Sequence, residues 1–277
     1  MNKPVFFVFC VTSIRNELRQ YIVCRVLQFI LFFNQPNIFA PYFVKLKASV
    51  YSNNLLIGIT DLKIGDESMG CVCGELTPTD DYFKKVQQQV WQFWASNKPD
   101  YDKWNALRIN VQLENGYFLN PMGGYTIGDV VELPDEPKTI EIAGVFRHVI
   151  DDYFKNEPPL LFVEEPWLAI DINHKIYLEE ELQKEIRQEQ NTVLDFLGLK
   201  HALVDYNCSA LCRTVQSDDV LFSIYGKGEA DADFALVHLT FSGKKENNPK
   251  WPSTTFFKSF DEFKLLKMYP DKEDWKE

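Results

Sequence analysis

Two close pairs of cysteines are the most obvious candidates for metal binding or redox chemistry in this sequence. The pairs are Cys71/Cys73 and Cys208/Cys212, and the chain holds six cysteines in total. Neither pair has the C-x-x-C spacing that is typical of zinc sites and thiol redox sites. Buried, inert thiols are the interpretation that we favour. A four-sulfur metal site built from both pairs stays open as an alternative.

His238 is the histidine best placed to act in catalysis, because it lies inside an apolar segment, Phe234 to Phe241, that is predicted to be a strand. A buried imidazole needs a hydrogen-bond partner, so a structural histidine is the simpler interpretation. A catalytic His238 would need a nucleophile beside it, and Cys71 or Cys73 is the candidate. This arrangement defines one alternative function, a small-molecule hydrolase or transferase.

Motifs for phosphate binding and for serine catalysis are absent. The sequence contains neither GxxxxGK[ST] nor GxGxxG, and it lacks the GxSxG nucleophile motif. The four histidines show no repeated metal-ligand spacing such as HExxH. We therefore predict no cofactor, no bound metal and no catalytic residue, and we expect that the protein is not an enzyme.

An acidic segment is the most informative group of charges. The carboxylates are Glu179, Glu180, Glu181, Glu185 and Glu189, all within a predicted helix at residues 177–190. Such a helix has a negative surface, which is usually only solvated but can also attract a basic partner.

The overall charge excludes one broad class of function. The chain has 277 residues, 29 Lys and Arg, 40 Asp and Glu, and a formal net charge of -11. General nucleic-acid binders depend on clustered Lys and Arg that contact phosphates, so we predict no nucleic-acid partner. With six cysteines in 277 residues, a reducing cytoplasmic compartment fits better than a disulfide-rich secreted one.

Residues 1–41 form an apolar, basic leader that differs from the rest of the chain. Residues 1–40 carry four basic residues and one acid, a net charge of +3, so the remaining residues sum to -14. The apolar run is too short for a membrane-spanning helix, and no signal-peptide cleavage site follows it. A weak membrane anchor and a helix that packs on the domain stay open. We favour a third interpretation, upstream sequence included by a misplaced start codon.

We expect the chain without residues 1–40 to be soluble and folded, because acidity and normal globular patterning belong to the remainder. Solubility and circular dichroism of the shortened chain test this prediction. Aggregation would show that the leader is part of the core.

The remainder is predicted to have an α+β fold of two modules, each a small, largely antiparallel sheet with one or two packed helices. The first domain covers residues 42–150, a linker covers 151–169, and the second domain covers 170–277. Period-two alternation, Asn-Gly turn chemistry and helical spacing define the elements. In the first domain these are a hairpin at 43–51 and 55–59, a strand at 69–76, a helix at 80–95, a hairpin at 106–113 and 117–119, an irregular loop with Gly123, Gly124 and Gly128, and a strand at 139–145. In the second they are the helix at 177–190, a helical region at 207–214, strands at 220–225, 234–241 and 254–258, and a helix at 260–267.

The most distinctive sequence segment runs from Phe234 to Phe263. It combines His238-Leu239-Thr240-Phe241, Trp251-Pro252, and an aromatic-rich helix start at Ser259-Phe260-Asp261-Glu262-Phe263. This segment, together with Asp218-Asp219 upstream, resembles small bacterial modules of the immunity-protein type that are associated with polymorphic toxins. Ile57-Gly58, Gly65-Asp66 and Met69-Gly70 resemble a second module of this kind. The resemblance covers residues 42–147 and 172–268 and implies a fold better than an activity.

The resemblance implies a cytoplasmic bacterial protein that binds and neutralises a partner toxin encoded nearby. The acidic charge suits a basic toxin, since complementary potentials accelerate association. We expect the interface at the acidic residues 179–189 and at three exposed aromatic residues, Trp251, Phe256 and Phe257. A non-catalytic structural adaptor is a further alternative, and membrane association is expected at most for the segment 1–41.

Overall fold

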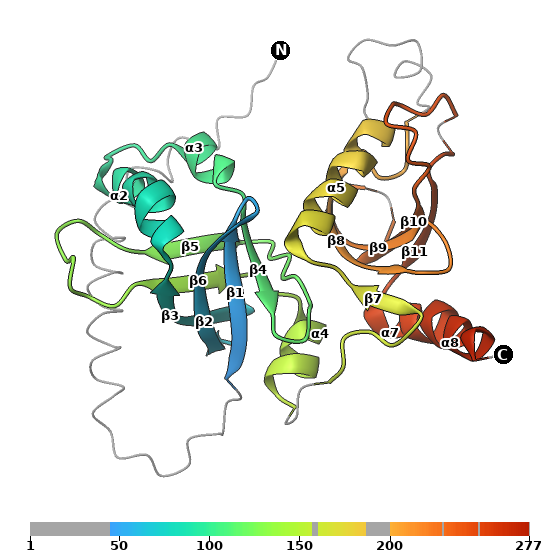
Figure 1. Ribbon diagram of the computed structural model, residues 1–277, viewed down its shortest axis with the longest axis horizontal. Coiled ribbons are helices and arrows are strands. Elements are labelled where there is room, and N and C mark those ends of the chain that lie inside the picture. The colour runs from blue at the N-terminus through green and yellow to red at the C-terminus, as the bar shows by residue number, and fades with distance from the viewer. Residues whose placement is uncertain (1–44, 157–159, 187–199, 229, 249, 277) are drawn as a thin grey trace, which may run out of the picture. The chain divides into compact units, whose positions relative to one another are not determined.

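The computed structural model describes residues 45–156, 160–186, 200–228, 230–248 and 250–276 (Figure 1). These residues belong to one compact unit, Phe43–Glu277. The predicted leader, residues 1–41, lies outside the described residues. Among the described residues, no helix has both the length and the apolar composition needed to cross a membrane.

The predicted α+β class with two antiparallel sheet modules is confirmed. The first sheet has six strands in the order β4-β1-β2-β3-β6-β5, and all neighbours are antiparallel. Its strands are β1 (Leu46–Ser52), β2 (Leu55–Asp66), β3 (Cys71–Pro78), β4 (Ile109–Leu113), β5 (Gly124–Gly128) and β6 (Thr139–Ala143).

A helical segment covers one face of this sheet. It consists of a π-helical turn η1 (Tyr82–Val86) and helix α2 (Gln87–Ala95), and the short α3 (Tyr101–Ala106) follows. Tyr82, Val86 and Val90 lie at helical spacing and are fully or almost fully buried. The apolar residues of β1 alternate with polar ones, so a single face of the strand packs into the core. The predicted hairpin, third strand and helix are therefore confirmed.

One prediction for this sheet is wrong. The segment with Gly124 and Gly128 was expected to be an irregular loop, but it forms the edge strand β5, whose Ile127 is opposite Ile140 of β6. Glycine is disfavoured in strands, but at Gly128 the paired strand is close: a Cβ there would lie 2.4 Å from the Thr139 hydroxyl oxygen, so a larger residue would require the Thr139 side chain to rotate. Consequently β6 is an inner strand and does not close the sheet.

Asp129, directly after β5, anchors the helical segment to the sheet. Its side chain is fully buried and accepts hydrogen bonds from Tyr82 Oη (2.7 Å), Gln87 Nε2 (3.0 Å) and Trp91 Nε1 (3.0 Å), while Lys138 Nζ lies 3.5 Å away. Burial raises the pKa of Asp129, but these hydrogen bonds outweigh it and hold the pKa below its usual range. The folded protein therefore favours the ionised form of the Asp129 side chain.

The second sheet has five strands in the order β11-β10-β9-β8-β7. The strands are β7 (Trp167–Ala169), β8 (Tyr206–Thr214), β9 (Asp219–Gly226), β10 (Phe234–His238) and β11 (Ser253–Phe257), and the helices are α5 (Ile172–Ile186), α7 (Phe260–Phe263), η3 (Lys264–Met268) and α8 (Tyr269–Trp275). The predicted strands β9, β10 and β11 are confirmed. The helical prediction for residues 207–214 is wrong, because this segment is β8 and pairs with β9 along its length.

Aromatic rings connect the two sheets through the intervening segment, which contains α4 (Arg147–Val149) and the π-helical turn η2 (Ile150–Phe154). Phe162 lies 4.9 Å from Tyr117 and 5.6 Å from Phe260 between ring centroids, and His148 lies 5.2 Å from Phe234. Phe162, within the segment 151–169 that was predicted to be a linker, is only 1% exposed. The domain boundaries at residues 150 and 170 stay a prediction.

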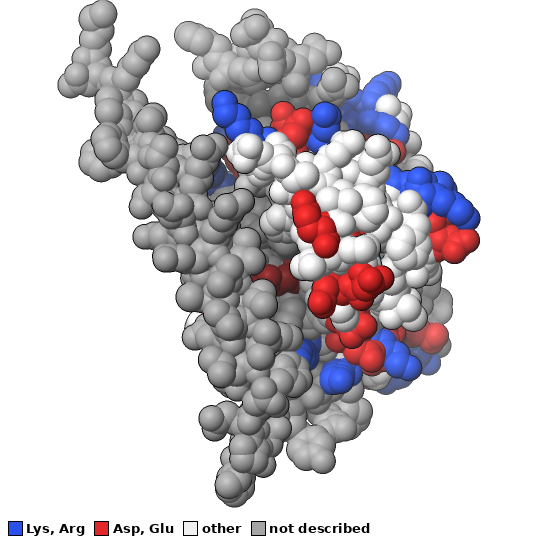
Figure 2. Space-filling view, turned by 90° about the vertical axis from the view of Figure 1, so that its left-hand side faces the viewer, with Lys and Arg blue, Asp and Glu red and all other residues white. Residues whose placement is uncertain are grey.

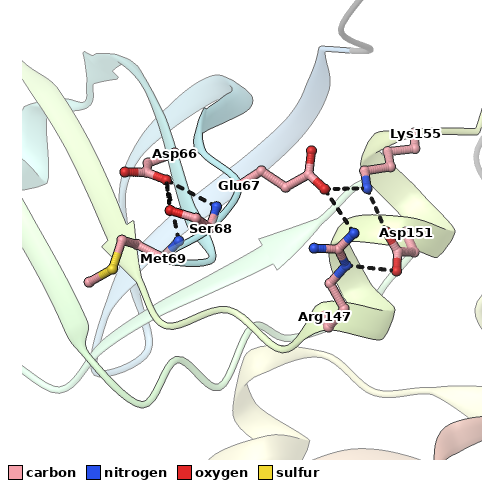
Figure 3. A network of polar contacts seen from close by, with 7 residues as sticks. All are labelled: Asp66, Glu67, Ser68, Met69, Arg147, Asp151 and Lys155. Atoms are coloured by element: carbon pink, nitrogen blue, oxygen red, sulfur yellow. Dashed lines mark hydrogen bonds and ion pairs between the residues drawn. The ribbon is translucent and has the colours of Figure 1, made fainter.

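A network of four charged side chains joins the β2–β3 turn to η2 (Figure 3). Glu67 and Asp151 each contact both Arg147 and Lys155, at distances of 2.6 to 2.9 Å. Hydrogen bonding to Lys155 holds the pKa of Glu67 below its usual range. All four side chains are substantially exposed, so salt screens the network and its main effect is to orient the turn.

Candidate functional site

The acidic helix is not the free negative surface that the sequence predicts. Glu180 is exposed and lies 3.8 Å from Arg108, but Glu181 and Glu185 are only 3% and 1% exposed. Glu179 is partly buried and pairs with Lys175. Glu189 lies outside the described residues. Glu181 and Glu185 lie at helical spacing from Leu178 and Leu182, so their carboxylates are on the packed side of α5. The expectation that these two residues belong to a solvated acidic face is therefore wrong.

Glu185 holds the start of the loop that follows β10. Its carboxylate accepts hydrogen bonds from the backbone N–H of Thr240 (2.9 and 3.2 Å to its two oxygens) and of Phe241 (2.7 Å). Burial raises the pKa of Glu185, and the backbone donors oppose that shift. Phe241 has φ of 50°, a left-handed conformation that is unfavourable for a bulky residue. The buried carboxylate therefore stabilises a strained backbone.

Glu181 fixes the next turn of the same loop. It accepts a hydrogen bond from the backbone N–H of Gly243 (2.8 Å) and lies 3.1 Å from Lys184 Nζ. In addition, the backbone N–H of Glu246 donates to the Glu185 carbonyl oxygen (3.0 Å). The acidic residues of α5 thus act as hydrogen-bond acceptors for residues 240–246.

Helix α5 lies beside β8 (Figure 1), and its residues Lys175 and Glu179 contact the part of the β8 edge that β7 leaves unpaired. Glu179 accepts from the backbone N–H of Ala210 (3.0 Å), and Lys175 Nζ donates to Glu179, to Ser209 Oγ and to the Ala210 carbonyl (3.5 Å). Lys175 is 1% exposed and lies 5.2 Å from the ring centroid of Phe118. Two charged side chains here replace a missing neighbouring strand.

The three aromatic residues expected at an interface differ in exposure. Trp251 is 42% exposed, as predicted, and Phe256 is partly buried. Phe257 is only 5% exposed, so its predicted exposure is wrong. Alternation along β11 explains the difference, since Phe257 points into the core against Phe263 while Phe256 points to the other face near Tyr206.

The backbone of β11 has a short open edge. The Phe257 carbonyl accepts from Asp233 on the β10 side, so Phe257, Thr255 and Ser253 direct their backbone groups toward β10. Thr254 and Phe256 direct theirs to the opposite side, where no hydrogen bond to them is found among the described residues. On that side the Pro252 carbonyl bonds His201 Nε2 (2.9 Å) and the Lys258 N–H bonds Glu262 (2.5 Å), which delimits the opening to two residues.

His238 and the cysteines are not assembled into a catalytic pair. His238 Nδ1 lies 2.8 Å from Asp219 Oδ1 on the neighbouring strand, and its ring lies 6.3 Å from that of Trp251. Cys71 contacts Glu141 (3.2 Å) in the first sheet, so the proposed nucleophile and His238 belong to different sheets.

The cysteine pairs are also separated. Cys71 and Cys73 lie on β3 and Cys208 and Cys212 on β8, so the structure does not form the four-sulfur site. Within the described part of the chain, no group of three or more His, Cys, Asp or Glu residues is arranged to hold a metal ion. Burial raises the pKa of Cys208 to about 12 and raises that of Cys212 well above its usual value, which makes both thiols poor nucleophiles at neutral pH.

Negative charge is displayed on other parts of the surface. The loop between β5 and β6 carries three exposed acids, Glu132, Asp135 and Glu136. Figure 2 shows acidic side chains within a broad uncharged area on the side where α2 and this loop lie, with Lys and Arg toward its margins. The acidity of the chain is therefore not confined to α5.

The sequence analysis missed one more feature, a surface hollow between α5 and β8. Its lining includes Tyr177, Phe241 and Arg213, three residues far apart in the sequence. No local pattern predicts this site, because its residues come from a helix, a strand and a loop that only the folded structure brings together. In addition, β8 was predicted to be helical.

Comparison of the chain with protein-family models, with curated proteins and with solved structures gave no match.

Proposed function

We propose that this protein is a non-catalytic binding protein of the immunity type, which neutralises a toxin encoded by a neighbouring gene. The single observation that carries the proposal is the edge of β11 beside exposed Trp251, which no described residue of the chain covers. Two outward N–H donors and two outward carbonyl acceptors, on Thr254 and Phe256, are ready to pair with an extended segment of a partner. Trp251 and Phe256 supply aromatic area at this edge, and aromatic residues are enriched where interfaces gain most of their energy.

The charge of the chain favours a basic partner. The formal net charge is -11, and acidic side chains lie on several exposed elements. Complementary charge accelerates association and makes it sensitive to salt. The resemblance of residues 172–268 to immunity-type modules supports the same proposal.

Co-expression tests the proposal directly. The chain is expected to restore growth of bacteria that express the toxin from the adjacent gene, and to purify with that toxin. Absence of binding to any product of a neighbouring gene would contradict the proposed function.

The substitution Thr254→Pro tests the docking edge. It removes an outward N–H and leaves the ladder to β10 intact, so the protein is expected to fold and to lose at least about tenfold in toxin affinity. The substitution Trp251→Ala is expected to lower the affinity for the toxin about thirtyfold. Isothermal titration calorimetry, with the purified toxin titrated into each purified variant, measures both affinities.

A matched control is available in the same chain. Trp275 on α8 is 49% exposed, similar to Trp251, and Trp275→Ala is expected to leave affinity unchanged. Wild-type affinity for folded Thr254→Pro and Trp251→Ala would show that the partner binds elsewhere.

A further inference from the structure

The surface hollow between α5 and β8 has the features of a small-molecule site. Its volume is about 410 Å³, and it is lined by Asn173, His174, Tyr177, Leu178, Arg213 and Phe241. The rings of Tyr177 and Phe241 are nearly parallel, with an interplanar angle of 8° and centroids 6.1 Å apart. The two rings stack on each other, and the sides that they turn to the hollow offer flat apolar surface to a flat apolar ligand.

One wall of the hollow is held in place by a buried charge. Phe241 has a left-handed backbone, and Glu185 accepts hydrogen bonds from its N–H and from that of Thr240. Strained residues that are held by their surroundings cluster at ligand sites. Glu185 thus fixes the backbone from which the Phe241 ring projects.

Arg213 supplies an available positive charge. It is exposed, and no ion pair or hydrogen bond of its side chain is found among the described residues. The other charged groups at this end of α5 satisfy one another, since His174 Nδ1 lies 2.9 Å from Asp171 Oδ2. Asn173 accepts from Asn54 (3.4 Å), which leaves the Asn173 amide N–H₂ as a further donor. A guanidinium binds a carboxylate with two parallel hydrogen bonds.

We propose that this hollow binds a small aromatic carboxylate, with the ring against Tyr177 and Phe241 and the carboxylate on Arg213. The site is separate from the β11 edge and does not depend on the proposed function. It gives the protein a second binding activity, directed at a metabolite-sized ligand.

Benzoate is the probe for this proposal, and the protein is the full chain. Saturation-transfer NMR and titration are expected to show saturable binding of benzoate. Benzamide, which keeps the ring but lacks the charge, and acetate, which keeps the charge but lacks the ring, are each expected to bind at least about fivefold more weakly.

Variants locate the binding. Arg213→Gln is expected to weaken benzoate at least about fivefold, and Phe241→Leu, which removes the flat ring, is expected to weaken it by a similar factor. Arg108→Gln is the control, because Arg108 is also exposed and lies near α5 through Glu180 but does not line the hollow, and it is expected to leave benzoate affinity unchanged. Near-ultraviolet circular dichroism verifies that each variant is folded.

Three outcomes would overturn the proposal. They are the absence of saturable benzoate binding, equal affinity for benzoate and benzamide, and undiminished binding by folded Arg213→Gln. The comparison of benzoate with benzamide uses the unmodified protein, so it tests the need for a negative charge on the ligand even if a variant does not fold. None of these outcomes affects toxin binding at β11, which is measured with Thr254→Pro.

Discussion

Replacing Asp129 with alanine is expected to lower the free energy of unfolding by about 3–5 kcal/mol. The Asp129 side chain is fully buried and lies 3.5 Å from Lys138 Nζ, whose side chain is 11% exposed. Without the carboxylate, Tyr82 Oη and Trp91 Nε1 lose their acceptor in the interior, and an unsatisfied buried donor is costly. Equilibrium unfolding in urea measures the change.

Two further variants separate the charge from the hydrogen bonds. Tyr82→Phe removes one donor and leaves the rest, so its cost is expected to be about 1 kcal/mol. Asp129→Asn keeps an acceptor oxygen and is expected to lie between the two. A loss below about 1 kcal/mol for Asp129→Ala would mean that the helical segment is not anchored through this carboxylate.

The contribution of Asp129 depends on pH in a defined direction. The hydrogen bonds from Trp91, Tyr82 and Gln87 outweigh burial and lower the pKa of Asp129 in the folded protein. A group with a lowered folded pKa binds fewer protons in the native state, so its stabilising effect is complete above the unfolded pKa, about 3.9, and is lost as the pH falls further. The difference in unfolding free energy between wild type and Asp129→Asn is expected to shrink below about pH 4.

Replacing Lys175 with alanine is expected to cost about 3–5 kcal/mol. The substitution leaves a cavity beside Phe118 and removes the donor of Ser209 and of the Ala210 carbonyl at the uncovered edge of β8. Lys175→Met fills most of the same volume and keeps contact with the Phe118 ring, so its cost is expected to be clearly smaller. Urea unfolding compares the two, and equal losses would show that volume is not the deciding quantity.

The pH dependence of the Lys175 variants has the same sign as that of Asp129, because folding lowers the pKa of both groups, but it falls in the alkaline range. Burial lowers the pKa of Lys175, although Glu179 acts in the other direction. The native state therefore releases this proton more readily than the unfolded chain, and the cost of the buried charge is relieved as the pH rises toward the unfolded pKa of about 10.4. Wild type is expected to gain stability relative to Lys175→Met as the pH rises toward about 10.

Local patterns predicted the parts of the fold that depend on neighbouring residues. The hairpin of β1 and β2 follows from alternation and from the Asn53-Asn54 turn, and the helix with Tyr82, Val86 and Val90 follows from its spacing. These elements bury one face only, so their periodicity is visible in the sequence.

The elements that were predicted wrongly depend on distant partners. In β8, the run from Ser209 to Cys212 is buried on both faces, so it has no alternation, and its pairing with β9 decides the structure. The same reason applies to the acidic residues of α5. Charge alone predicts exposure for Glu181 and Glu185, whereas the loop at residues 240–246, more than fifty positions away, provides the donors that allow their burial.

The two edges of the five-stranded sheet determine how many strands a partner can add. One edge is blunted, because β7 has three residues and Lys175 and Glu179 occupy the backbone groups of Ala210 beyond it. At the other edge, β11, the backbone of Thr254 and Phe256 has no partner on its outer side within the described part of the chain. A sheet with one blunted edge does not polymerise through repeated head-to-tail addition. Strand addition to this sheet is therefore expected to stop at one partner segment per chain.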